Sequence, residues 1–146
     1  MNLNQIQSNH HFSFTIAINA SKDKVWETLI DVPNWKNWDT EIKSSQLNGA
    51  FIVGASGIMK PLKGPKLDFY ISELIPFKTY TFKTKMPLGW LEIKRTISDE
   101  NNTVLFNDDI QFTEISKRFF GLILGGGFRK VLPKVMDNFK IIAESE

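Results

Sequence analysis

The chain has 146 residues and a mass of 16.8 kDa, and 42% of its residues are hydrophobic, which suffices for one domain with a single core and excludes wholesale disorder. Its 18 Lys and Arg against 16 Asp and Glu give a net charge of +2, and because the basic residues are scattered, they predict no nucleic-acid partner. The absence of cysteine excludes disulfides, thiolate metal sites and cysteine nucleophiles.

The first ten residues are mainly polar and are expected to form a flexible N-terminal arm, with residues 11–146 as a single domain. The arm has neither the cationic start nor the apolar stretch of a signal peptide. The longest apolar run, 119–128, contains four glycines and is much shorter than the ~20 residues that span a bilayer. The sequence therefore predicts a cytoplasmic protein without integral membrane association.

Residues 11–18 begin the ordered pattern with a strict alternation of polar and apolar side chains, which predicts a half-buried strand. Ser21 follows in a position typical of a helix N-cap, and a short apolar stripe predicts the helix itself. Pro33 ends or restarts that helix, so a second short helical piece is expected through Trp35 and Trp38.

Six further strands are expected between residues 41 and 112, because short apolar-alternating runs are separated by turn residues. Tight turns between them predict sequential antiparallel hairpins. With the first strand, they make a seven-stranded antiparallel sheet. The runs are 41–48 and 55–62, then from Leu67 up to Pro76, from Tyr80 up to Pro87, from Leu91 up to the turn at 99–102, and from Val104 to Phe112.

The C-terminal stretch from residue 116 to 146 has an apolar stripe at helical spacing, which predicts one long helix. Gly125, Gly126 and Gly127 each cost a helix roughly 1 kcal/mol relative to Ala, so we expect the helix to begin near Phe128. Pro133 is expected to kink the helix if it begins earlier than about residue 130.

These elements follow the order of the helix-grip fold, an α+β fold in which a sheet wraps around a long C-terminal helix, with two short helices after the first strand. Residues 16–26 and 31–38 resemble the opening of polyketide cyclase/dehydratase-like proteins, and so do the segments 47–49, 54–57 and 133–144. These proteins belong to the superfamily that includes START lipid-transfer domains and the birch-pollen-allergen fold. The resemblance covers residues 12–144.

The resemblance implies an internal cavity between the sheet and the terminal helix that holds a hydrophobic or amphipathic small molecule. The resemblance does not by itself imply catalysis, because many members of the superfamily only bind or carry a ligand and no shared catalytic motif exists to carry over. A related branch often has a histidine in the penultimate strand, where this chain has Arg95.

Arg95 and Asp108 each interrupt an otherwise apolar alternation on the last two expected strands. A two-residue turn at Asn101 and Asn102 places them directly opposite each other, and a four-residue turn at 99–102 makes them diagonal neighbours. Both registers put the two side chains on one face, within reach of each other. Because an isolated buried charge is very costly, an inward pair is expected.

This pair has two interpretations that the sequence leaves open. In the first, the two residues form a structural salt bridge, or a β-bulge turns one of them toward solvent. In the second, they form a polar contact for a ligand carboxylate, carbonyl or hydroxyl in an apolar pocket. If the protein catalyses a reaction, Asp108 would carry the proton, as a weak base held ionised by Arg95.

Aromatic and aliphatic side chains from the expected inner face complete the candidate ligand-binding set. Trp35 and Trp38 are expected to fill the corner between the short helices and the terminal helix, with Trp38 at the pocket mouth as the alternative. Tyr80 is the side chain best placed to turn a hydroxyl inward. The full candidate set is Phe14, Trp38, Phe69, Tyr80, Phe82, Ile93, Arg95, Phe106, Asp108, Ile110, Phe128 and Leu132.

No cofactor and no metal site is expected, because the chain lacks cysteine and its two histidines have no ligand spacing. His10 and His11 are interpreted as solvated residues at the start of a strand. Four acidic residues and the scattered lysines are interpreted as a solvated face; the four are Asp39, Glu41, Glu92 and Glu100.

Three functions remain open from the sequence. The first is binding or carriage of a small hydrophobic or amphipathic molecule by a monomer or weak homodimer. The second is a cyclase/dehydratase-type enzyme acting on an apolar substrate in the same cavity. The third is an interaction module that binds a partner through apolar residues such as Phe119, Phe120 and Leu122.

Overall fold

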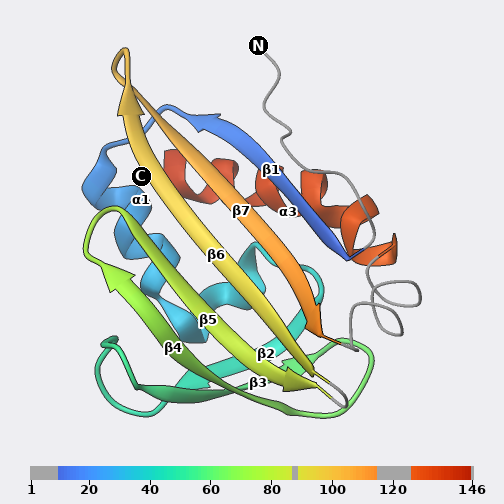
Figure 1. Cartoon of the computed structure of the whole chain (residues 1–146). Coiled ribbons are helices and arrows are strands. Elements are labelled where there is room, and N and C mark those ends of the chain that lie inside the picture. Colours follow the sequence, from blue (N-terminus) through green and yellow to red (C-terminus); the bar gives the residue numbers. More distant parts are fainter. Residues whose placement is uncertain (1–9, 87–88, 115–125, 146) are drawn as a thin grey trace.

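The computed structural model describes residues 10–86, 89–114 and 126–145, and the side chains in these ranges except those of residues 113–114 and 126–128. Its elements follow one another in the expected order (Figure 1). They are β1 (His11–Ile18), α1 (Lys22–Ile30), the 3-10 helix η1 (Val32–Asn37), β2 (Ile42–Leu47), β3 (Ser56–Pro61), β4 (Leu67–Ile75), β5 (Thr79–Met86), β6 (Gly89–Glu100), β7 (Thr103–Glu114) and α3 (Gly126–Glu144).

The seven strands form one antiparallel sheet in the order β1-β7-β6-β5-β4-β3-β2, so hairpins join β2 to β7 in sequence and β1 closes on β7. The sheet curls, and α3 runs across its concave face behind β1 and β7 (Figure 1). This arrangement is the helix-grip fold, and it confirms the α+β class and the seven-stranded sheet expected from the sequence.

Two irregularities help the sheet to curl. The register shifts between Ile42 and Ser44 on β2 and between Ile71 and Glu73 on β4, and bulges of this kind bend a strand and increase its twist. Gly57 of β3 lies so close to the Gln46 carbonyl oxygen and the Phe69 ring that no side chain fits there. The strongly curved part of the sheet, β2 to β4, therefore depends on backbone features.

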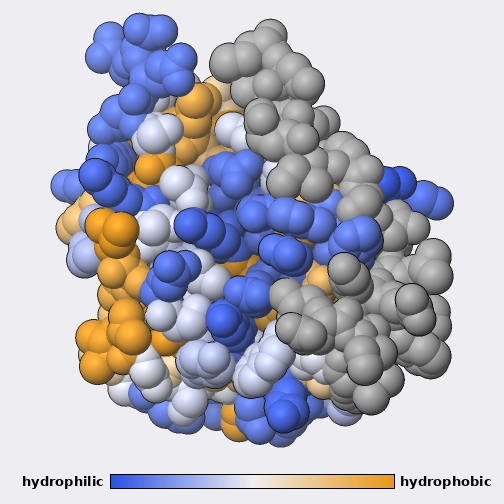
Figure 2. Space-filling view, viewed as in Figure 1, coloured by the Kyte–Doolittle hydropathy of each residue, from blue (hydrophilic) through white to orange (hydrophobic). Residues whose placement is uncertain are grey.

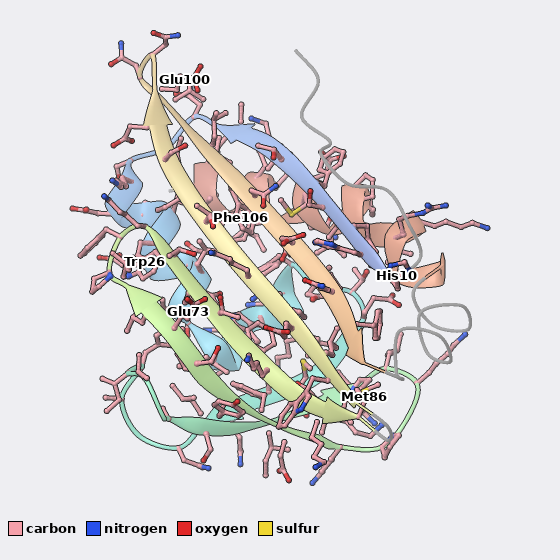
Figure 3. All side chains as sticks on the ribbon, viewed as in Figure 1. His10, Trp26, Glu73, Met86, Glu100 and Phe106 are labelled. Carbon is pink, nitrogen blue, oxygen red and sulfur yellow. The ribbon has the colours of Figure 1, made fainter. Side chains whose placement is uncertain are left out.

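The core lies between the concave face and the helices. Phe106 on β7, labelled in Figure 3, contacts the ring of Phe139 on α3 at a centroid distance of 4.7 Å. Trp38, which follows η1, contacts the same Phe139 ring at 4.9 Å. Phe139 thus joins α3 both to the sheet and to the short helices. Met86 and Glu100 mark the opposite ends of the sheet in Figure 3.

The short helices begin and end as the sequence predicts. The Ser21 hydroxyl accepts a hydrogen bond from the Lys24 amide at 3.1 Å, which caps α1 at its N-terminus. Pro33 lies in the first turn of η1, where its missing N–H costs no hydrogen bond.

The helix α3 begins at Gly126, two residues before the expected start at Phe128, so that prediction was wrong. The two glycines occupy the first turn, where backbone N–H groups have no intrahelical partner, and the packing of the later turns outweighs their low helix propensity. Pro133 consequently lies inside the helix. The flexible arm predicted for residues 1–10 lies outside the described residues apart from His10, and so does Gly125.

No described helix combines the length and apolar character that a bilayer crossing requires.

Candidate functional site

The β6–β7 hairpin brings Arg95 and Asp108 together. Its turn is made by Asn101 and Asn102, both in the left-handed region with φ of 52° and 65°, as in the two-residue turns that match the twist of a hairpin. The register therefore pairs Arg95 directly with Asp108, which confirms one of the two expected registers. Arg95 Nε lies 3.5 Å from Asp108 Oδ1, and both side chains are almost completely buried.

Aromatic rings surround the Arg95 guanidinium. Its central carbon lies 4.8 Å from the ring centroids of both Trp35 and Trp38, 5.1 Å from that of Phe82 and 6.0 Å from that of Tyr80. Desolvated cation–π contacts at such distances each contribute up to about 2 kcal/mol. The rings thus compensate part of the free energy that the cation loses by leaving water.

The Tyr80 hydroxyl connects Arg95 to the end of α1. It accepts a hydrogen bond from Arg95 Nη1 at 3.1 Å and donates one to the Leu29 carbonyl oxygen at 2.8 Å. Trp35 Nε1 donates to the same carbonyl, also at 2.8 Å. Leu29 belongs to the last turn of α1, where carbonyls lack intrahelical partners, so both bonds satisfy an otherwise orphaned acceptor. Burial raises the pKa of Tyr80 to about 12, with Arg95 opposing, and keeps the hydroxyl a donor.

Asp39 is the residue that the sequence interpretation missed. It was expected on a solvated face, but its side chain is buried, 3% exposed, just beyond Trp38. Its Oδ1 accepts a hydrogen bond from the Glu41 amide at 3.0 Å. Burial raises the pKa of Asp39 to about 6, and Arg95 opposes this rise. The available signal was an Asp three residues before the start of β2, whose side chain can accept a hydrogen bond from the backbone two residues ahead.

The direction of the Asp108 pKa shift also differs from expectation. The Arg95 contact alone predicted a carboxylate held ionised, but burial raises the pKa of Asp108 above its usual value, and Arg95 only opposes this rise. The reason is that desolvation of a fully buried carboxyl outweighs the attraction of the one cation beside it. Asp108 is therefore a stronger base than the pair alone suggested.

Three polar atoms in this cluster form no hydrogen bond with the part of the chain that the structure describes. They are Trp38 Nε1, Arg95 Nε and Asp108 Oδ1, all buried, and the last two face each other as the 3.5 Å ion pair without a hydrogen bond between them. Leaving such an atom unpartnered costs about 1–3 kcal/mol. Two donors and one acceptor therefore remain available within one aromatic-lined region of the interior, and we define this region, with Asp39 and Tyr80, as the Arg95 cluster.

The remaining candidate residues belong to the same hydrophobic core, with different degrees of burial. Phe14 is half-buried and packs against the edge of the core, whereas the others with described side chains are fully buried. The side chain of Phe128 lies outside the described residues. Apart from the Arg95 cluster and the rings that surround Arg95, the buried candidate residues are Phe69, Ile93, Phe106, Ile110 and Leu132.

The two tryptophans have different neighbours. Trp38 contacts Phe139 of α3 and so fills the predicted corner, and it also lines a surface hollow. Trp35 packs on Phe69 and Phe82 of the sheet, at centroid distances of 5.7 and 5.1 Å. The surface hollow encloses about 270 Å³ between α1, η1 and α3, and polar side chains make up most of its lining.

Exposed apolar side chains gather at two neighbouring turns. Ile52 and Val53 in the β2–β3 loop and Ile75 and Phe77 at the β4–β5 turn are 43–58% exposed, and Figure 2 shows the apolar surface over these turns. The residues predicted for an interaction surface, Phe119, Phe120 and Leu122, lie outside the described residues.

The histidines are not a metal site among the described residues, where no group of three metal-ligating side chains occurs. His11 was expected to be solvated, but it is half-buried and its Nε2 lies 2.9 Å from Asp109 Oδ1. This pair joins β1 to β7 on the outer face of the sheet.

Comparisons with known proteins place the fold in context. The family model described as polyketide cyclase/dehydrase and lipid transport matches residues 9–144. No curated protein matches the sequence.

Solved structures share the fold at low sequence identity. The Aha1 dimer from Colwellia psychrerythraea is 21% identical, with a TM-score of 0.70 over 92% of this chain and 96% of that one. XoxI from Bacillus cereus is 16% identical, with a TM-score of 0.70 over 91% and 94%. The di-domain ARO/CYC StfQ from the steffimycin biosynthetic pathway is 10% identical, with a TM-score of 0.68 over 93% of this chain and 50% of that one.

Proposed function

Because this chain belongs to the polyketide cyclase/dehydrase and lipid transport family, we propose that it binds a small hydrophobic or amphipathic molecule between the sheet and α3. The Arg95 cluster holds the polar group of this molecule. The apolar remainder lies against the aromatic and aliphatic side chains of the inner face, among them Phe82, Phe106 and Leu132.

The unpartnered polar atoms of the cluster are the observation that carries this proposal. An interior built only for packing gains nothing from burying Trp38 Nε1, Arg95 Nε and Asp108 Oδ1 without hydrogen bonds from the described residues, even though the last two attract each other as an ion pair. A ligand atom that bonds one of them recovers about 1–3 kcal/mol of desolvation cost. Since aromatic rings surround the same atoms, the site suits a molecule that is mostly apolar with one polar end.

A fluorescence titration tests this proposal. The probe is the uncharged naphthyl ketone 6-propionyl-2-dimethylaminonaphthalene, whose emission reports the polarity around it. We expect saturable binding, weakened about tenfold by Trp38→Phe, which removes Nε1 and keeps an aromatic ring in the core. Trp90→Phe on β6 is the matched control and should bind as the wild type does. Absence of saturable binding, or equal affinity of the Trp38→Phe variant, would refute the proposal.

A cyclase/dehydratase-type reaction is the second candidate, and the pKa values of the buried carboxyls favour it. Burial raises the pKa of Asp39 to about 6 and raises that of Asp108, so both can exchange protons closer to neutral pH than ordinary carboxyls. An Asp108→Asn variant of an enzyme should lose turnover and keep ligand affinity. Loss of folding in that variant would instead assign Asp108 to a structural salt bridge.

For the assembly state we propose a monomer or weak homodimer. The Aha1 structure with the same fold is a dimer. Light scattering on this protein over a range of concentrations distinguishes the two states, and a tight dimer at the lowest concentration would contradict the proposal.

A further inference from the structure

We propose, building on the function proposed above, that the Arg95 cluster selects an uncharged ligand whose polar group is a hydroxyl or carbonyl, and that it rejects carboxylates. Arg95 would ordinarily suggest the opposite, because a guanidinium is the usual partner of a ligand carboxylate. The charges that surround it in this chain reverse that expectation.

The charge balance of the interior is the first argument. Among the residues that the structure describes, the fully buried charged side chains are Arg95, Asp39 and Asp108. One cation thus faces two carboxyls, and both act on it electrostatically. A ligand carboxylate would add a third acidic group to a buried region with a single cation, and like charges brought together in an interface cost several kcal/mol.

The contacts of the guanidinium are the second argument. Asp108 lies 3.5 Å from its Nε, the Tyr80 hydroxyl accepts from its Nη1, and four aromatic rings lie within 6.0 Å of its central carbon. A carboxylate would need the planar two-nitrogen fork of Arg95 for a bidentate bond. One nitrogen of that fork already bonds Tyr80, so the paired geometry that favours carboxylates is not free.

The atoms that remain available fit a neutral oxygen. Trp38 Nε1 donates no hydrogen bond to any residue that the structure describes. Arg95 Nε and Asp108 Oδ1 face each other as an ion pair at 3.5 Å but form no hydrogen bond with the described residues either. A ligand hydroxyl can donate to Asp108 Oδ1 and accept from either N–H, and a carbonyl can accept from both donors. Either group adds no charge to the interior, and each satisfies at least one of the buried atoms.

Asp39 and Asp108 are consequently specificity-determining residues. If their negative charge excludes carboxylates, then removing it from either one should relax the exclusion. The Asp108→Asn variant keeps the shape of the side chain but removes one of the two carboxylates whose negative charge balances that of Arg95. The Asp39→Asn variant tests the same idea at a position that lies on a different element.

The experiment compares three probes with one ring system: 2-naphthol, 2-acetylnaphthalene and 2-naphthoate, titrated calorimetrically at neutral pH. For the wild type we expect both uncharged probes to bind at least about tenfold more tightly than 2-naphthoate. In Asp108→Asn, and in Asp39→Asn if the first variant does not fold, the affinity for 2-naphthoate should rise about tenfold relative to 2-naphthol. Asp68→Asn, which removes a carboxylate from an exposed position of β4, should leave the preference unchanged.

Tighter binding of 2-naphthoate than of 2-naphthol by the wild type would overturn this inference and leave the proposed ligand binding intact. An unchanged preference in a folded Asp108→Asn or Asp39→Asn variant would also overturn it. Failure of all three probes to bind would refute the proposed function itself, and this inference with it.

Discussion

Replacing Arg95 by methionine tests the electrostatics of the interior directly. The substitution keeps an unbranched side chain that can pack between the rings of Trp35 and Trp38. It removes the only cation that faces Asp39 and Asp108 among the buried residues that the structure describes. At the 3.5 Å that separates Arg95 Nε from Asp108 Oδ1, an effective dielectric constant of about 20 gives an attraction of about 5 kcal/mol. Loss of one partner of a buried ion pair costs about 3–5 kcal/mol in practice.

The cost should depend on pH, and its sign follows from the carboxyls. Burial raises the pKa of both Asp39 and Asp108, and without Arg95 the largest influence that opposes this rise is lost, with only the Glu41 amide still opposing it at Asp39. A group with a raised folded-state pKa stabilises the fold when protonated, and that contribution disappears as the pH rises through the folded-state pKa. We therefore expect the free energy of unfolding of Arg95→Met to be lower than that of the wild type by about 3–5 kcal/mol near pH 8 and by roughly half of that near pH 5.

Urea unfolding followed by tryptophan fluorescence measures these losses at both pH values. Lys94→Met is the matched control, because it removes a cation from the neighbouring, exposed position of β6 and should change the free energy of unfolding by no more than about 0.5 kcal/mol. An Arg95→Met variant as stable as the wild type near pH 8, or one that loses more stability near pH 5, would refute the reasoning.

Three further substitutions have defined outcomes. The pKa of Asp39 rises from 3.8 to about 6, so the free energy of unfolding of the wild type should fall by about 3 kcal/mol between about pH 4 and pH 6. In urea unfolding, the Asp39→Asn variant should show a weaker dependence of this free energy on pH. Tyr80→Phe removes the hydroxyl that accepts from Arg95 Nη1 and donates to the Leu29 carbonyl, so thermal unfolding should show a free energy of unfolding lower by about 1–3 kcal/mol. An unchanged free energy of unfolding would contradict these hydrogen bonds. Gly57→Ala places a methyl group against the Gln46 carbonyl and the Phe69 ring, so it should lower the midpoint of urea unfolding clearly, and an unchanged midpoint would contradict the close approach.

The sequence predicted the fold well because each element has a local signal. Alternation marks the strands, Ser21 marks the start of α1, and the Asn101–Asn102 dipeptide marks the turn that sets the β6–β7 register. Once the register is known, the pairing of Arg95 with Asp108 follows by counting. These features depend only on neighbours in the chain or directly across a hairpin.

The rest of the site could not be predicted in this way because it depends on packing between distant elements. Asp39 is acidic and follows a short helix, and only the placement of η1 against the sheet makes it buried. The raised pKa of Asp108 likewise results from desolvation, which no pairing rule reports. The start of α3 at Gly126 shows the same limit, since tertiary packing outweighs the low propensity of glycine.

The indole N–H resonance of Trp38 provides the most direct measurement of the central claim, that unpartnered polar atoms in the core bind the polar group of a ligand. Nitrogen-15 spectra resolve one such signal for each of the four tryptophans, and the signal missing from Trp38→Phe identifies it. On titration with 2-naphthol, the Trp38 signal should move downfield as Nε1 gains an acceptor, while the Trp90 signal stays in place. A Trp38 signal that does not move when the protein is saturated with the probe would contradict the account.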